Sequence, residues 1–235
     1  MAVRIDNLAF RWSPGGPAVL DIPELEIADG AQVLITGPSG SGKTSLLNIL
    51  SGITLPNSGN VEILNTDMRT LSAAARDAFR ADHIGVIFQM FNLIPYLSVT
   101  ENVMLACTFS AARRDRAAGA GGITEQAHRL LTSLGLAPDT FGSRRVDALS
   151  IGQQQRVAAA RALIGNPGLV IADEPTSALD AANRQSFIDL VSNACRDCGA
   201  TLIVVSHDEA LFPFFDHRID MTSLNARALS GEPIS

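Results

Sequence analysis

Lysine is almost absent from this chain of 235 residues, because Lys43 is the only one and every other basic side chain is an arginine. Acidic residues outnumber basic ones by 24 to 18, and the formal net charge is −6. A protein that binds nucleic acid without sequence preference needs a surplus of basic side chains to neutralise phosphates. The charge balance therefore argues against such a protein, and we expect no nucleic-acid partner.

Long apolar segments are also missing. No run approaches the roughly 20 apolar residues that a membrane-spanning helix requires. The first residues, MAVRIDNLAF, lack the apolar core of a secretory leader. We therefore expect a cytoplasmic protein.

Cysteine is scarce as well, with Cys107, Cys195 and Cys198 as the three examples, and an odd number does not suggest a disulfide framework. Cys195 and Cys198 match the pattern C-x-x-C, but a zinc site would need a second pair of ligands. We expect these two residues to lie one turn apart on a helix.

Two kinds of strand pattern divide the chain. Residues 3–12 and 24–30 alternate between apolar and polar side chains, which predicts an antiparallel sheet around the turn SPGGP. Short, almost wholly apolar runs predict strands that are buried on both faces of a parallel sheet. These runs are residues 31–36, 84–88, 169–172 and 201–206.

Helical patterns lie between the apolar runs, at residues 43–51, 99–112, 124–134, 152–164 and 182–198. We therefore predict an α/β fold with a mainly parallel central sheet, an N-terminal antiparallel β-subdomain and a helical insert. Residues 113–122 are charged and then glycine-rich, and we interpret them as a surface connection within that insert.

Lys43 lies in the sequence GPSGSGKT, residues 37–44. The pattern G-x-x-x-x-G-K-[ST] is that of a P-loop, in which glycines let backbone N–H groups surround phosphate at the start of a helix. A compact ammonium fits between two phosphates where a planar guanidinium is too broad, which explains the lone lysine. The Thr44 hydroxyl is expected to bind Mg²⁺. The expected nucleotide contacts are Gly37, Pro38, Ser39, Gly40, Ser41, Gly42, Lys43, Thr44 and Ser45.

The sequence LVIADEP, residues 169–175, places two carboxylates at the end of a buried strand. Ligands of open α/β sheets bind at the carboxyl ends of the strands. Asp173 is therefore expected to hold the Mg²⁺ shell, and Glu174 is expected to polarise a water molecule for attack on a γ-phosphate.

The sequence LSIGQQQR, residues 149–156, contains a second helix start that suits an anion. Ser150 followed by Gln153 is the pattern of a capping box. The hydroxyl of Ser150 and the N–H of Gly152 would then lie at the positive end of a helix and face a phosphate. A single chain rarely wraps two such loops around one nucleotide.

Five motifs occur in the order that is typical of one family. They are GPSGSGKT, the FQ that contains Gln89, LSIGQQQR, LVIADEP with SALD at 177–180, and VVSHD, which contains His207. With these motifs the chain resembles the ATP-binding-cassette (ABC) ATPases, which have a P-loop NTPase fold. The resemblance implies a single domain over residues 1–235, with a core and β-subdomain at 1–88 and 165–235 and a helical subdomain at about 89–164.

The resemblance also implies a mechanism. Two copies would pair head to tail around two ATP molecules, each held by the P-loop of one copy and the signature LSIGQQQR of the other. Gln89 would sense Mg²⁺ and the γ-phosphate, and Asp180 would connect the two sites. Glu174 would be the catalytic base, His207 would grip the γ-phosphate, and Lys43 would also belong to the catalytic residues.

The segment FRW, residues 10–12, resembles the family's adenine-stacking segment. Trp12 is the expected partner of the adenine ring, and Phe10 is the alternative. A place for Trp12 in the core of the N-terminal sheet also stays open.

One position departs from the family's signature, which usually reads LSGGQ, because Ile151 replaces the first glycine. An isoleucine does not easily adopt a positive φ, so we expect an extended or helical backbone at Ile151. Ser150, Gly152 and Gln153 are retained for contact with the nucleotide, and we expect an active protein with an altered rate.

Residues 84–106 most resemble the ATPases of lipoprotein-releasing and macrolide-exporting systems and of the related bacterial cell-division complex. The stretch MFNLIPYLS within them is apolar for a loop. This loop is either buried in the helical insert or part of a groove that receives a helix from a membrane permease. Ser98 and Glu101 then predict a capping box at the start of the next helix.

The predicted function is that of the ATP-binding and ATP-hydrolysing subunit of an ABC transporter, with ATP and Mg²⁺ as cofactors. It would power a separately encoded permease at the inner face of the cell membrane through ATP-driven dimerisation. The alternative is the ATPase of a mechanical complex of the cell-division type, which moves no solute. A cassette that acts on DNA or ribosomes is disfavoured, because coiled-coil heptads, duplicated cassettes and basic arms are absent.

Overall fold

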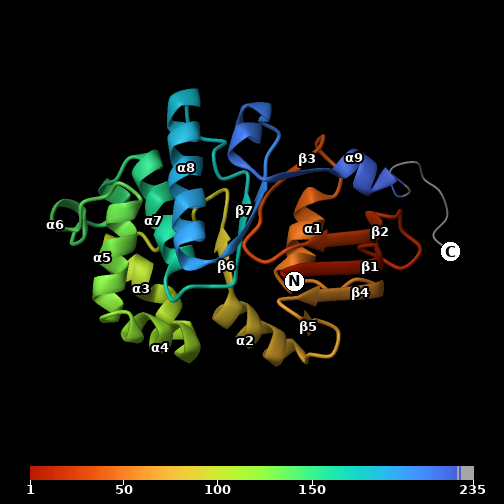
Figure 1. Cartoon of the computed structure of the whole chain (residues 1–235), viewed down its shortest axis with the longest axis horizontal. Helices are drawn as coiled ribbons and strands as arrows, with labels where there is room; N and C mark the ends of the chain where they lie inside the picture. Colours follow the sequence, from red (N-terminus) through yellow and green to blue (C-terminus); the bar gives the residue numbers. More distant parts are fainter. Residues whose placement is uncertain (227, 229–235) are drawn as a thin grey trace.

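The computed structural model describes residues 1–226 and 228, except for the side chains of residues 181 and 182. The described strands form an antiparallel sheet of four strands and a parallel sheet of five. The helices of residues 99–163 gather at one end of the molecule, while the antiparallel sheet lies at the other end (Figure 1).

The antiparallel sheet contains, in spatial order, β2 (Leu20–Ile27), β1 (Val3–Phe10), β4 (Ser58–Ile63) and β5 (Thr66–Asp67). As predicted, β1 and β2 pair in antiparallel fashion on either side of the turn SPGGP. The sequence pattern does not predict β4, because Val61 and Ile63 are its only buried apolar residues. Two such positions are too few to show an alternation.

The parallel sheet contains, in spatial order, β6 (Ile84–Ile87), β7 (Leu169–Asp173), β8 (Thr201–Val205), β3 (Gln32–Thr36) and β9 (His217–Asp220). The first four of these strands coincide with the predicted apolar runs. Strand β9 lies at the edge of the sheet and is partly exposed, so its sequence HRID lacks an apolar pattern. Because the pairings are parallel, β3, β7 and β8 end at the same edge of the sheet.

The predicted helices are all present, as α1 (Lys43–Leu50), α3 (Val99–Phe109), α5 (Ile123–Ser133), α7 (Ile151–Leu163) and α8 (Ala181–Cys198). The sequence does not predict α2 (Ala73–His83), in which Phe79 is the one large apolar residue and no residue is fully buried. Short helical turns are α6 (Pro138–Phe141), α9 (Met221–Leu224), η1 (Val146–Ala148) and η2 (Glu209–Phe214). Both predicted capping boxes form, at the starts of α3 and α7.

The interpretation of residues 113–122 as a surface connection is wrong, because most of this segment belongs to helix α4 (Ala111–Gly119). Arg113 is only 2% exposed. Its guanidinium donates hydrogen bonds to the carbonyl oxygens of Ala162 and Ile164, at 3.0 and 3.1 Å. Charged runs usually lie in solvent, but here an arginine satisfies carbonyl groups at the end of α7 that have no partner within their own helix.

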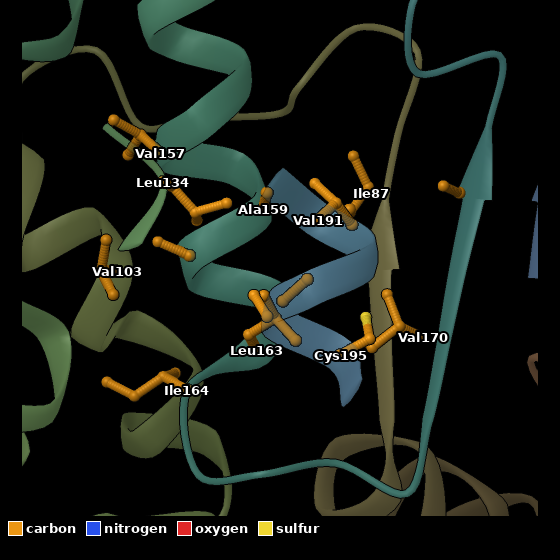
Figure 2. Packing of buried hydrophobic residues seen from close by; sticks show 14 of the residues in the cluster. Ile87, Val103, Leu134, Val157, Ala159, Leu163, Ile164, Val170, Val191 and Cys195 are labelled. Carbon is orange, nitrogen blue, oxygen red and sulfur yellow. The ribbon is translucent and has the colours of Figure 1, made fainter. Parts of the chain in front are cut away.

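Two apolar clusters lie on opposite faces of the parallel sheet. Val33 and Ile35 of β3 belong to the first cluster, which also contains residues of α1 and the antiparallel sheet. Leu34 of β3 points to the opposite face and belongs to the second cluster. Figure 2 shows the second cluster, where Leu163 of α7 and Val191 of α8 pack near β6 and β7. Because both faces of the sheet are buried, its strand ends are held rigidly, which matters for any site built on them.

Cys195 and Cys198 both lie on α8, as predicted. Burial raises the pKa of both thiols, so neither is activated as a thiolate. Within the described part of the chain, no group of three or more His, Cys, Asp or Glu residues is placed to hold a metal ion. No helix among these residues is long and apolar enough to cross a membrane.

Candidate functional site

The P-loop connects the end of β3 to the start of α1 through turns that need glycine. Gly40 and Gly42 have φ values of 82° and 96°. Gly42 also has no room for a side chain, because an added Cβ would lie 2.6 Å from Cδ2 of Leu20. The chain therefore curls tightly enough for α1 to direct its first N–H groups, at the positive end of the helix dipole, towards the loop.

Lys43 is the first residue of α1, and its ammonium reaches back over the loop. Its Nζ donates hydrogen bonds to the carbonyl oxygens of Gly37 and Pro38, both at 2.8 Å. The positive charge is thereby held beside the backbone N–H groups of the loop. This arrangement suits an anion with several oxygens.

A cavity of about 700 Å³ opens at the P-loop. Four predicted site residues from other parts of the chain also line it: Gln89 beyond β6, Asp173 and Glu174 at the end of β7, and His207 beyond β8. These residues converge because β3 and β7 both flank β8 and end at the same edge. The P-loop residues in the lining are Gly37, Pro38, Ser39, Gly40, Gly42, Lys43, Thr44 and Ser45.

The two carboxylates of the cavity have different environments. Burial and the charge of Glu174 raise the pKa of Asp173, and Lys43 partly counteracts them. Glu174 has a φ of 44°, a backbone conformation that costs about 1–3 kcal/mol and is common at functional sites. Its N–H donates to the carbonyl oxygen of Val205 at 2.9 Å, and its Oε1 lies 2.9 Å from Nδ1 of His207. This carboxylate is fixed in direction and can accept a proton from a water molecule.

A second cavity, of about 490 Å³, lies at the start of α7. Ser150, Gly152, Gln153 and Asp180 line it, and none of these four lines the P-loop cavity. In the capping box, Oγ of Ser150 accepts the N–H of Gln153 at 3.3 Å, and Oε1 of Gln153 accepts the N–H of Ser150 at 2.9 Å. The chain therefore carries two separate sites that suit an anion.

Ile151 has a helical backbone, as predicted, because it is the first residue of α7 and does not have a positive φ. Its side chain is 54% exposed. The branched side chain therefore lies at the surface of the second cavity, beside Ser150 and Gly152.

Trp12 and Ser41 lie outside the lining of both cavities. Trp12 is 63% exposed and contacts Phe10 edge-on, with ring centroids 4.9 Å apart. Phe10 is only 4% exposed, so Trp12 is the better placed of the two to stack on a base, and it is not a core residue. Ser41 is 1% exposed, which suits support of the loop rather than contact with a ligand.

Comparison with known proteins decides the family. The ABC transporter family model matches residues 20–177, a range that contains the P-loop, Gln89, the signature, Asp173 and Glu174. The chain belongs to the ABC transporter family. The predicted family is therefore confirmed.

Relatives of this ABC protein include the uncharacterized ABC transporter ATP-binding protein Rv2564 of Mycobacterium tuberculosis, 37% identical over 219 residues. The match covers 92% of this chain but only 64% of that relative's length. The lipoprotein-releasing system ATP-binding protein LolD of Bacteroides fragilis is 36% identical over 211 residues, which are 90% of this chain and 94% of LolD.

Among solved structures, the ABC protein is similar to the ATP-binding cassette MJ0796, in a dimeric post-hydrolysis state bound to ADP and Pi. The TM-score is 0.78 at 35% identity, with 93% of each chain covered. This similarity confirms the predicted α/β fold with its antiparallel sheet, parallel sheet and helical segments.

Two residues that hold loops of this ABC protein in place were not predicted from the sequence. Arg161 of α7 donates to the carbonyl oxygens of Phe91 and Asn92, at 2.5 and 2.6 Å, in the loop that follows Gln89. Asn225, beyond α9, is fully buried and donates to the carbonyl oxygen of Ser41 in the P-loop. Neither residue lies in a motif that faces the nucleotide, so the sequence holds no direct sign of these contacts.

Proposed function

We propose that this chain is the ATP-hydrolysing subunit of an ABC transporter, and that two copies enclose two ATP molecules and thereby drive a separate permease. The observation that carries the proposal is the separation of the P-loop cavity from the signature cavity. A two-fold head-to-tail pair would bring each P-loop opposite the signature of the other copy. The dimeric cassettes of MJ0796 support this arrangement. Asp180 lies in the signature cavity and would connect the two sites.

The P-loop cavity fits a nucleoside triphosphate with Mg²⁺. Its volume of about 700 Å³ is in the range of small-molecule sites. Thr44, Gln89 and Asp173 present hydroxyl, amide and carboxylate oxygens, which are the hard ligands that Mg²⁺ prefers. Bound there, Mg²⁺ would offset the negative charge of the β- and γ-phosphates. The protein supplies few ligands, so phosphate and water oxygens would complete the shell.

Glu174 is the proposed general base, because its backbone is fixed by the bond to Val205 and its carboxylate faces the cavity. His207, 2.9 Å from that carboxylate, would orient it and contact the γ-phosphate. Lys43 and the N–H groups of the P-loop would stabilise the charge that develops on the phosphate oxygens. Loss of the γ-phosphate would then weaken the contact between the two copies.

The permease is proposed to dock in a groove between α2, β6, α3 and α7. The groove has a volume of about 370 Å³, and its lining includes Ile53, Phe88 and Phe109, which are 53%, 38% and 74% exposed. An amphipathic helix of the permease would bury these side chains and hold the cassette at the inner face of the membrane. Met90 and Tyr96 of the loop MFNLIPYLS are 80% and 74% exposed, which argues against burial of that loop in the helical insert.

Residues 89–164 are proposed to move as a helical subdomain against a core formed by 1–88 and 165–235. In support, the described elements between β6 and β7 are all helices. A rotation of this segment would move the signature, which lies in it, towards or away from the partner's P-loop.

The experiment that tests the proposal is size-exclusion chromatography with light scattering on Glu174→Gln. This substitution keeps the shape of the side chain but removes the base, so bound ATP should persist and hold two copies together. We expect a dimer with MgATP and a monomer with MgADP.

Two further variants serve as controls. Glu125→Gln, the same change at an exposed position of α5, should leave ATP hydrolysis unaffected and the chain monomeric. Addition of Ser150→Arg to Glu174→Gln should abolish the dimer while ATP still binds. A dimer that ignores the nucleotide, or a monomer under every condition despite ATP binding, would contradict the proposal.

A further inference from the structure

Helix α9 and the residue after it pack against the P-loop, and neither Met221 nor Asn225 lines the nucleotide cavity. Met221 and Asn225 are four residues apart, so they lie on the same face of this helical turn. Met221 is fully buried, and an added Cβ at Gly37 would lie 2.9 Å from its Cβ. Asn225 is near the other end of the loop, because an added Cβ at Gly42 would lie 3.4 Å from its Nδ2.

The side-chain amide of Asn225 joins two segments that are far apart in sequence. Its Nδ2 donates to the carbonyl oxygens of Ser41 and Val19, at 3.1 and 2.8 Å. Its Oδ1 accepts the N–H of Asp21 at 2.7 Å. Ser41 belongs to the P-loop, and Val19 lines the same cavity. One fully buried amide thus makes three hydrogen bonds to backbone groups, and these join the P-loop at Ser41 to the segment around Val19, which lines the nucleotide cavity.

We propose that Asn225 is a positioning residue for the nucleotide: it locks the P-loop to the segment around Val19 and so sets the affinity for ATP. The inference rests on the proposed ATP-binding function. Without the amide, the carbonyl oxygens of Ser41 and Val19 would be buried without this donor, and the loop would relax to satisfy them. The P-loop binds phosphate tightly only when its backbone N–H groups already point into the cavity. A relaxed loop would therefore bind ATP more weakly. Asn225 is fully buried and does not line the nucleotide cavity, so it would act on the nucleotide only through the loop.

The test is the substitution Asn225→Asp, which keeps the size and the acceptor for Asp21 but removes both donated hydrogen bonds. A carboxylate oxygen would then face the carbonyl oxygens of Ser41 and Val19. We expect the Kd of the non-hydrolysable analogue MgAMP-PNP and the KM for ATP to rise together by about tenfold or more. The kcat should change by less than about threefold, because Glu174 and Lys43 are not altered.

The matched control is Gln126→Glu, the same amide-to-carboxylate change at another buried residue. The amide of Gln126 binds Asn166 and the N–H of Gly165, and none of these residues lines the P-loop cavity. This variant should lose thermal stability but bind MgAMP-PNP like the wild type. Equal loss of affinity in both variants would show a general effect of destabilisation and would overturn the inference.

A second variant and a measurement on the wild type cover the case in which Asn225→Asp does not fold. Asn225→Ala removes the three bonds without adding a charge and should also raise the Kd.

In the wild type, MgAMP-PNP should slow amide hydrogen exchange in peptides that cover residues 19–21 and 221–226. The role of Asn225 would be overturned if the wild type bound MgAMP-PNP without this slowing. It would also be overturned if folded Asn225 variants bound the analogue as tightly as the wild type. Neither result would affect the proposed function. Wild-type protein that does not bind MgAMP-PNP would overturn the proposed function as well.

Discussion

The P-loop and the signature loop both lie at the start of a helix, but the two helix starts differ in how they are capped. Helix α1 begins after Gly42 and has no side-chain cap. Helix α7 begins with a capping box, in which Ser150 and Gln153 bond to each other's backbone N–H groups. An uncapped start leaves more N–H groups for a phosphate. The P-loop can therefore hold an anion by itself, and the signature has fewer free N–H groups, in line with its proposed role of completing a site on another copy.

The two loops also differ in how closely other residues surround them. The P-loop is buttressed by Met221 and Asn225 and faces Asp173, Glu174 and His207 across its cavity. The signature is more open, because Ile151, the first residue of α7, is 54% exposed. Changes in the P-loop should therefore impair nucleotide binding and hydrolysis together. Changes in the signature should impair hydrolysis and leave binding to the single chain intact.

The largest effect is expected from Lys43→Ala. Loss of the only ammonium at the P-loop should abolish ATP hydrolysis, measured as phosphate release, because even one positioned donor to a developing charge is worth about 100-fold in rate. Binding of ATP should weaken as well, which a fluorescent analogue can measure. An amine-reactive reagent offers an independent check: it should modify Lys43 and the terminal amine only, and MgATP should protect Lys43. Full hydrolysis by protein labelled at Lys43 would contradict this role.

Gly152→Asp is expected to stop ATP hydrolysis without weakening the binding of ATP to the single chain. A carboxylate on the signature would face the γ-phosphate held by the other copy and repel it, so hydrolysis should stop. The Kd of ATP for the single chain should stay within about threefold of the wild type, since Gly152 does not line the P-loop cavity. Loss of ATP binding in this variant would show that the two loops are not independent half-sites.

Trp12→Ala should weaken ATP binding about tenfold, because stacking of a base on an aromatic ring is worth about 1–3 kcal/mol. Isothermal titration with MgATP measures the change. Tyr96→Ala is the control, since Tyr96 is also a largely exposed aromatic residue but belongs to the loop MFNLIPYLS and not to the segment FRW that is expected to stack on adenine. Equal Kd values for wild type and Trp12→Ala would remove Trp12 from the adenine site.

The smallest effect is expected from Ile151→Gly. The backbone at Ile151 is already helical, and Ser150 and Gly152 keep their places, so turnover should change only a few-fold, or about 1 kcal/mol of barrier. Steady-state hydrolysis measures it, with Gly152→Asp as the contrasting variant. An equal loss of hydrolysis rate in Ile151→Gly and Gly152→Asp would contradict the view that Gly152 contacts the phosphate and Ile151 does not.

The sequence predicts well where a pattern is local. The apolar runs of β3, β6, β7 and β8, and the capping pairs of α3 and α7, lie within single elements, and the structure contains all of them. It fails where a long-range contact supplies the stabilisation. Arg113 follows a solvent-like charged pattern yet is buried against the end of α7. Edge strand β9 is held by its pairing with β3 rather than by an apolar pattern of its own.

What the sequence alone determined is the chemistry of each loop, because glycine spacing, a lysine at a helix start and a carboxylate at a strand end act within a few residues of each other. The tertiary structure decided which of these loops share a cavity and which do not. It brings Glu174 to His207, 33 positions away, and keeps Ser150 apart from the P-loop. It also brings Asn225 to Ser41 across 184 positions. Such contacts depend on strand order and on the packing of helices on the sheet, which no local pattern encodes.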